Sequence, residues 1–334
     1  METKQENMQF LGLLGVYKES YKIIFSWRKI FSQITLTLIL PLTFIFLGHI
    51  QVSDFLFGKI VHDSVQITET EPGTPQQQKL IEMISSEWAT LTLFKLVYFT
   101  FMLIFSLIST SAVVYTVASI YTGREVTFNK VISVVPKVWK RLVVTFLCTV
   151  VAFFVYNVMA VMVIIIWALT IGVRSGGIAI LLVITILYLI GIMYLTVVWQ
   201  LASVVTVLED SYAFEAMTKS KELIKGKMGL SVFICLKLNV SFFLIQFLFM
   251  MVVVNGWKLF GMSSIGRTSY GILCFLLLSH LFLLMLVLQT VLYFVCKSYH
   301  NQNIDKSVLS DHLEGYQAKY EPLMAKDVQL DYHV

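Results

Sequence analysis

Charged residues are scarce in this sequence. Asp, Glu, Lys and Arg make up only 13% of its 334 residues, whereas hydrophobic residues make up 57%. A soluble domain typically carries about 25% charged residues, so the composition excludes an ordinary soluble protein. Several apolar runs exceed the roughly 18 residues that a helix needs to cross a bilayer. The sequence therefore predicts an all-α fold, a polytopic membrane bundle of transmembrane helices.

Cysteine is also scarce, and its placement excludes a disulfide framework. All four cysteines lie inside apolar runs or at their ends: Cys148, Cys235, Cys274 and Cys296. Disulfides stabilise segments exposed to an oxidising compartment, and no cysteine lies in such a segment. We expect buried free thiols. Palmitoylation of Cys296, at the inner end of the last apolar run, is an alternative.

Catalytic and metal-binding motifs are missing too. The sequence contains no GxxxxGK[ST], HExxH, GxSxG or CxxC motif, and no two of its six histidines have metal-ligand spacing. The adjacent Glu209 and Asp210 could act as general acid and base, but no nucleophile or metal ligand lies near them in the sequence. We interpret them as acids at a helix N-terminus. We expect no enzyme activity, no cofactor and no direct nucleic-acid binding.

Six apolar segments are long enough to span a membrane. They cover residues 31–50, 91–119, 142–171, 178–206, 229–253 and 271–296. The flanking segments 1–30, 120–141, 207–228 and 297–334 hold eighteen of the 25 Lys and Arg residues, and the three loops of the opposite side hold five. Because basic loops stay in the cytosol, both termini are predicted to be cytosolic.

The chain thus divides into three parts. Residues 1–30 form a cytosolic segment with an interfacial helix, residues 31–296 form the membrane domain, and residues 297–334 form a tail whose composition is typical of disorder. The first span is expected to act as its own signal and anchor. Residues 51–90 are the only long outer loop, with a break at "EPGTP" and a weak amphipathic helix after it. The endoplasmic reticulum and the plasma membrane are both consistent with this layout.

The most regular charged segment is "LEDSYAFEAMTKSKELIKGKMG", residues 208–229. On a helix, one face carries Tyr212, Ala213, Ala216, Met217, Ser220, Leu223 and Ile224. Ser211 is the expected N-cap and Gly226 the expected stop, and Glu215 precedes Lys219 at the favourable i,i+4 spacing. This pattern predicts a helix at the cytosolic membrane surface.

Similar segments precede the first and third spans. "SWRKIF" (26–31) and "VWKRLV" (138–143) share a Trp followed by two basic residues, and "IKGKMG" (224–229) keeps two basic residues. Each leads into a pair of spans, which predicts three repeats of an interfacial helix and a hairpin. The aromatic belt and the positive-inside rule would produce the same residues without duplication. The candidate basic lipid contacts are Arg28, Lys29, Lys140, Arg141, Lys219, Lys221, Lys225 and Lys227.

These residues carry a resemblance. The segment from Val207 to Gly229 is similar to one in the membrane domain of bacterial glycerophosphodiester phosphodiesterases, and the matching residues are Glu209, Ala216, Ser220, Leu223, Lys225 and Gly226. The resemblance is confined to the membrane half of those enzymes. The whole chain, with "HLEGYQAKYEPL" (312–323) in its tail, more closely resembles an uncharacterised family of plant six-span membrane proteins. Some of these are named for binding a polyadenylate-binding protein. That resemblance implies the topology and no established reaction.

Polar residues within the spans are the remaining lead, because they are costly in hydrocarbon and often functional. Two layers are expected from their distance along the helices, the deeper one formed by Asn157, Gln246 and His280 and the shallower one by Gln200, Lys237 and Gln289. They could line a solute path. They could equally hold the helices together by hydrogen bonds, with Lys237 reaching the surface.

Two functions remain open. The first is a non-catalytic scaffold or lipid-surface organiser, with membrane lipid as its partner and a cytosolic protein bound through the tail. There Tyr320 and Leu323, in "YEPL", have the form of a tyrosine-based sorting signal. The second is a transporter or channel for a small solute, which uses the intramembrane polar layers.

Overall fold

The structure is a computed structural model that describes residues 8–70, 73–124, 126–172 and 176–300. Every regular element within these ranges is a helix. Six helical stretches are long and apolar enough to cross a membrane: Arg28–Glu69, Pro75–Tyr121, Phe128–Thr170, Gly177–Leu208, Met228–Val254 and Ser264–Tyr299. The predicted all-α fold with six potential spans is confirmed.

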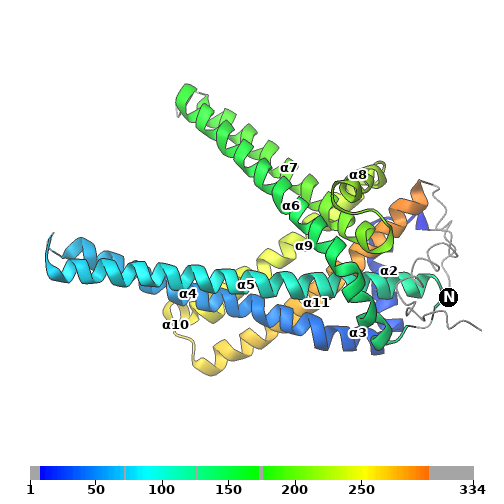
Figure 1. Cartoon of the computed structure of the whole chain (residues 1–334), viewed down its shortest axis with the longest axis horizontal. Coiled ribbons are helices and arrows are strands. Elements are labelled where there is room, and N and C mark those ends of the chain that lie inside the picture. The colour runs from blue at the N-terminus through cyan, green and yellow to red at the C-terminus, as the bar shows by residue number, and fades with distance from the viewer. Residues whose placement is uncertain (1–7, 71–72, 125, 173–175, 301–334) are drawn as a thin grey trace, which may run out of the picture.

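These stretches form three helical hairpins. The first pairs α4 (Leu40–Glu69), which continues α3 (Arg28–Ile34) and the π-helix η1 (Thr35–Ile39), with α5 (Pro75–Tyr121). The second pairs α6 (Phe128–Thr170) with α7 (Gly177–Leu208). The third pairs α9 (Met228–Leu248) and the π-helix η2 (Phe249–Val254), through the short α10 (Gly256–Phe260), with α11 (Ser264–Tyr299). The hairpins meet at one end and diverge at the other (Figure 1).

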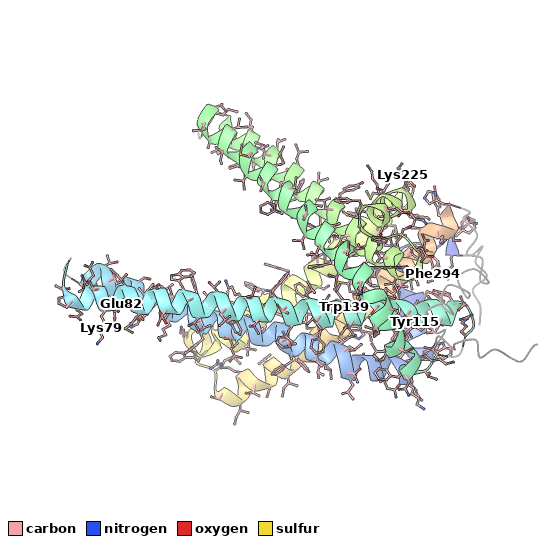
Figure 2. All side chains as sticks on the ribbon, in the orientation of Figure 1. Lys79, Glu82, Tyr115, Trp139, Lys225 and Phe294 are labelled. Carbon is pink, nitrogen blue, oxygen red and sulfur yellow. The ribbon has the colours of Figure 1, made fainter. Side chains whose placement is uncertain are left out.

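The core lies where the hairpins meet. Buried residues cluster in the last part of α5, the last part of α7 and most of α11 from Leu278 onward. Tyr115 and Phe294, both almost fully buried, lie in this region (Figure 2). The far halves of α6 and α7 expose apolar side chains such as Leu169 and Leu187. Lipid tails are as apolar as these side chains, so a membrane does not force such hairpins together.

The first hairpin extends furthest. Residues 51–90, predicted as an outer loop, are helical on both sides of the expected break, because α4 runs to Glu69 and α5 begins at Pro75. Thr74 caps α5 by accepting a hydrogen bond from the Gln77 amide. At 1.5 Å per residue α5 is about 70 Å long, more than twice the hydrocarbon thickness. Lys79 and Glu82 lie near the tip of this hairpin (Figure 2).

The three expected interfacial segments differ from one another. Before the first span, α2 (Leu13–Ser26) is a separate helix that buries Val16, Ser20 and Ile23 and packs on α11. Before the fifth span, α8 (Ala213–Ile224) is also separate. Before the third span, residues 128–141 simply form the start of α6. The repeat of three hairpins is therefore visible in the architecture, but only two hairpins are preceded by a separate helix.

Candidate functional site at the converging end

Helix α8 faces the protein with its apolar side. Ala216, Ser220, Leu223 and Ile224 are buried, and α8 packs against α6 and α7. The Ser220 hydroxyl donates a 2.8 Å hydrogen bond to the carbonyl of Val198 in α7. The helical periodicity of the sequence predicted this apolar face, and in the structure the face packs on the helical bundle. For the four buried residues the expected contact with the lipid interface is wrong, because protein covers them, whereas Tyr212, expected on the same face, is 49% exposed.

The turn into α8 is held by a hydroxyl of α6. The Thr145 hydroxyl accepts a 2.9 Å hydrogen bond from the backbone amide of Ala213, whose φ is +56°, and lies 3.0 Å from the Thr206 hydroxyl of α7. The N-cap is Tyr212, and the Ser211 hydroxyl, expected to cap the helix, donates to the Glu215 carboxylate. At the other end, Gly226 has a φ of +86°, as its expected stop position requires.

A cluster of hydrogen-bonded charges lies beside this turn. The Glu209 carboxylate accepts from the Tyr293 hydroxyl at 2.5 Å and from the Lys297 ammonium at 2.8 Å, both on α11. Its other oxygen pairs with Lys219 of α8. The Glu209 side chain is only 11% exposed. We call Glu209, Lys219, Tyr293 and Lys297 the charge cluster, and it joins α7, α8 and α11.

The surroundings keep Glu209 ionised. Burial raises the pKa of its carboxyl, but hydrogen bonds from Lys219, Lys297 and Tyr293 outweigh burial and hold the pKa below the usual 4.5. The neighbouring Asp210 is 75% exposed and pairs with Arg141 of α6 at 2.8 Å. Neither acid was expected to bridge helices, and the i,i+4 partner expected for Lys219, Glu215, is replaced by Glu209.

Five of the six residues that carried the resemblance have structural roles here, and the sixth, Lys225, is exposed. Ala216 and Leu223 are buried on the side of α8 that faces the bundle, and the Ser220 hydroxyl donates a hydrogen bond to α7. A Cβ on Gly226 would overlap the ring of Tyr299, and Glu209 holds the charge cluster. The pattern therefore describes how a short helix is fixed against a membrane bundle. The charge cluster itself was missed, and the inclusion of Glu209 in the pattern was the only signal for it.

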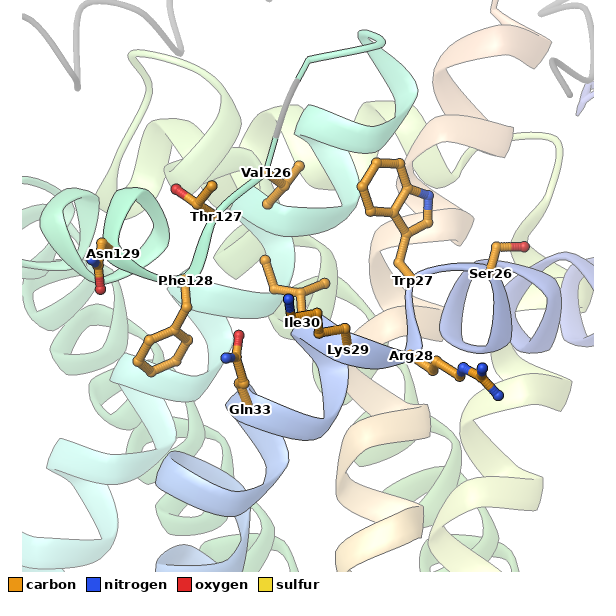
Figure 3. Close-up of a pocket in the computed structure, with 10 residues that line it drawn as sticks. All are labelled: Ser26, Trp27, Arg28, Lys29, Ile30, Gln33, Val126, Thr127, Phe128 and Asn129. Carbon is orange, nitrogen blue, oxygen red and sulfur yellow. The ribbon is translucent and has the colours of Figure 1, made fainter.

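A polar pocket lies at the same end. It has a volume of about 580 Å³ and lies between the α2–α3 corner and the residues that lead into α6. Figure 3 shows Lys29 and Gln33 of α3 pointing into the space opposite Phe128, while Arg28 points the other way. Thr127 and Asn129 add a hydroxyl and an amide. Of the candidate basic contacts, Arg28 and Lys29 both belong to the lining of this pocket, and Lys29 is the one whose side chain points into it.

The other candidate basic residues divide into two groups. Lys219 and Arg141 pair with Glu209 and Asp210, and the Lys227 ammonium lies 5.1 Å from the centre of the Tyr299 ring. The side chains of Lys140, Lys221 and Lys225 are exposed. The second group is therefore exposed without one of the contacts described for the first, and Lys29 directs its ammonium into the pocket.

The deeper polar layer is not a single site. Asn157 of α6 accepts a 3.0 Å hydrogen bond from the Tyr188 hydroxyl of α7, within the second hairpin. His280 of α11 lies 3.2 Å from the hydroxyl of Tyr21 in α2, and the two rings stack. Gln246 lies on α9, in the third hairpin. Asn157 and His280 thus link neighbouring helices in two different places.

Two members of the shallower layer do meet. Gln200 of α7 and Gln289 of α11 line one cavity of about 270 Å³ between the hairpins. Lys237 lies elsewhere, with its ammonium 4.8 Å from the centre of the Tyr17 ring. Asn239 of α9, which was not placed in either expected layer, also lines the cavity.

Metal-ligating side chains do not gather in the part of the chain that the structure describes, where no group of three could hold an ion. All four cysteines are free thiols. The sorting-signal residues Tyr320 and Leu323 lie outside the described residues.

Six apolar helices in three hairpins define a multi-pass membrane protein of the all-α class. A family model described as "Domain of unknown function (DUF8558)" matches residues 1–333, and the chain belongs to that family. The search of curated proteins and the search of solved structures give no match.

Proposed function

We propose that this protein is a non-catalytic membrane organiser whose converging end faces the cytosol and binds anionic lipid headgroups. The observation that carries the proposal is the pocket into which Lys29 and Gln33 point, with Arg28, Thr127 and Asn129 also in its lining. An ammonium with amide and hydroxyl groups around it supplies the charge and the donors that a phosphorylated headgroup needs. The excess of Lys and Arg at this end supports the cytosolic placement.

The location of the pocket favours a lipid over a soluble anion. Arg28 and Lys29 stand at the first residues of the first potential span, where headgroups lie. Trp27, which also lines the pocket, is 38% exposed, and exposed Trp is typical of the membrane interface. The outward-facing Lys140, Lys221 and Lys225 would add attraction to an anionic leaflet, about 1 kcal/mol for each residue near the surface.

Headgroup binding can be measured on the full chain in nanodiscs of neutral lipid. A short-chain phosphatidylinositol phosphate is titrated against Arg28→Gln/Lys29→Gln and against the matched control Lys221→Gln/Lys225→Gln, which removes the same charge outside the pocket. We expect about tenfold weaker binding in the first variant and little change in the control. Equal losses would indicate diffuse surface charge and contradict the proposal. Competition by inorganic phosphate at equal concentration would point to a soluble anion.

A transporter or channel is the second candidate, and the meeting of Gln200 and Gln289 in one cavity favours it. In a cysteine-free background, single cysteines at Asn157, Gln246 and His280 are probed with a membrane-impermeant thiol reagent. Labelling of all three would support a water-filled path. Protection of all three, with a labelled cysteine at Lys59 as control, would support the organiser.

A further inference from the structure

The cavity between the hairpins combines an apolar wall with unused amides. Its lining comes from α5, α6, α7, α9 and α11, so every hairpin contributes to it. Eleven of the nineteen lining side chains are apolar: Leu103, Leu107, Leu142, Phe146, Trp199, Leu238, Phe242, Leu281, Phe282, Met285 and Leu286. The other eight are Ser, Thr, Asn or Gln, and none is charged.

Most of the hydroxyls in this lining are already used as donors. Thr110, Thr145 and Thr196 each donate to a backbone carbonyl one turn earlier in their own helix, at 2.8–3.0 Å. The Asn239 amide donates to the Cys235 carbonyl at 2.8 Å. The Ser203 hydroxyl likewise donates to the Gln200 carbonyl at 2.8 Å. Among the eight polar side chains, the donors that remain in the described part of the chain are those of the two glutamines and of Ser106, which is exposed.

Gln289 is the decisive residue. The residue as a whole is only 7% exposed, and within the described ranges its side-chain amide makes no hydrogen bond to another residue, but the amide atoms remain open to the cavity that they line. Gln200 is half-buried, and its amide is likewise unbonded within the same ranges. Both amides therefore face the cavity with donors that no described protein group uses. A ligand in the cavity that accepts from them would gain hydrogen bonds that the mostly apolar wall does not supply.

From these features we infer that the cavity binds a neutral lipid with an apolar body and an uncharged hydroxyl head. The lining holds no Lys, Arg or His for a phosphate and no Asp or Glu for a cation. A cavity of about 270 Å³ could hold several waters, but its mostly apolar wall offers each of them few partners. The hydroxyl would bond to Gln289 and Gln200, and the body would pass between the diverging hairpins into the membrane.

This site is separate from the headgroup pocket, which is lined by other residues of α3 and the start of α6. The two sites also differ in ligand charge, so either proposal can fail while the other holds.

Photoaffinity labelling of the full chain in membranes tests the inference. Photoreactive analogues of a sterol, a diacylglycerol and a long-chain alcohol distinguish the sources of the hydroxyl, and a photoreactive phosphatidylcholine is the control probe. We expect at least one hydroxyl lipid to label segments of α5, α7, α9 or α11 that line the cavity, with competition by its unmodified form. Labelling no stronger than that by phosphatidylcholine would overturn the inference.

Two cavity variants and one control variant sharpen the test. Gln289→Leu removes the amide and keeps the size of the side chain, and about tenfold weaker labelling is expected, as for the loss of one good hydrogen bond. Gln246→Leu makes the same change on α9 outside the cavity and should label normally. Met285→Trp fills the cavity and should also remove the labelling that the unmodified lipid competes for. It provides a second test if Gln289→Leu folds poorly. Unchanged labelling in both cavity variants, or labelling of a cysteine at position 289 by an impermeant thiol reagent, would contradict a lipid site.

Discussion

The Glu209 carboxylate and the Lys297 ammonium lie 2.8 Å apart although 88 positions separate them in the sequence. One residue follows α7, and the other is in the last turn of α11. With Lys219 on the second oxygen of Glu209, this pair fixes α8 between two of the hairpins. The charge cluster therefore holds α7, α8 and α11 together at the converging end.

Replacement of Glu209 is expected to destabilise the bundle. Glu209→Gln leaves two lysines and the Tyr293 hydroxyl facing a neutral amide, and breaking such a buried pair costs about 3–5 kcal/mol. The measurement is thermal unfolding in detergent, followed by tryptophan fluorescence. Asp210→Asn is the control, because its pair with Arg141 is exposed and worth about 0–1 kcal/mol. Equal shifts in the two variants would contradict the role of the cluster.

The stability of the wild-type chain should fall in acid because of Glu209. The folded pKa of this carboxyl is held below its usual value of 4.5, so its contribution is complete above pH 4.5 and is lost as the pH falls through the folded pKa. We therefore expect the difference in melting temperature between wild type and Glu209→Gln to be constant from pH 7 to pH 5. Below pH 4.5 it should shrink. A melting-temperature difference that grows on acidification would contradict a lowered pKa of Glu209 in the folded state.

Two glycines near the end of α8 should respond oppositely to alanine. Gly226 has a φ of +86°, and its added Cβ would overlap the Tyr299 ring. Gly226→Ala should cost about 1–2 kcal/mol from the left-handed backbone alone, plus the overlap. Gly229 lies in the first turn of α9 with open space around it, so Gly229→Ala should be neutral or stabilise the chain by up to about 1 kcal/mol. Thermal unfolding of both variants distinguishes these outcomes.

The face of α8 should tolerate no enlargement. Ala216 is fully buried against the bundle, and Ala216→Leu is expected to cost about 1–3 kcal/mol by overpacking. Thr218→Leu adds a similar side chain on the exposed face and should change stability by no more than about 0.5 kcal/mol. If α8 instead rested its apolar face in lipid, both changes would be tolerated. Limited proteolysis at the α8–α9 turn is a second measurement, because Ala216→Leu should detach α8 from the bundle and speed cleavage there.

The orientation of the chain can be tested at two exposed residues. In a cysteine-free background, Gln76→Cys lies near the tip of the first hairpin and Glu222→Cys lies on α8. If the converging end is cytosolic, an impermeant thiol reagent added to intact cells should label the first and spare the second. Permeabilised cells control for reactivity, and the reverse pattern would place the converging end outside.

The sequence by itself determined the number of potential spans, because hydropathy over about 20 residues depends only on composition. It also determined the buried face of α8 and its stop at Gly226, which are properties of helical periodicity and of one φ angle. Periodicity gives the direction of an apolar face and not its partner, so lipid and protein could not be distinguished for that face.

Only the tertiary structure decided which polar groups meet. Gln200 and Gln289 share a cavity, whereas Asn157 and His280, expected at one depth, contact different helices. Depth along a helix fixes one coordinate, and the rotation and crossing of the helices fix the others. The role of Glu209 in joining helices is seen only in the structure, where Tyr293 and Lys297 of α11 contact its carboxylate. These residues are 84 and 88 positions away from Glu209, and contacts at such a separation produce no periodic pattern in a single sequence.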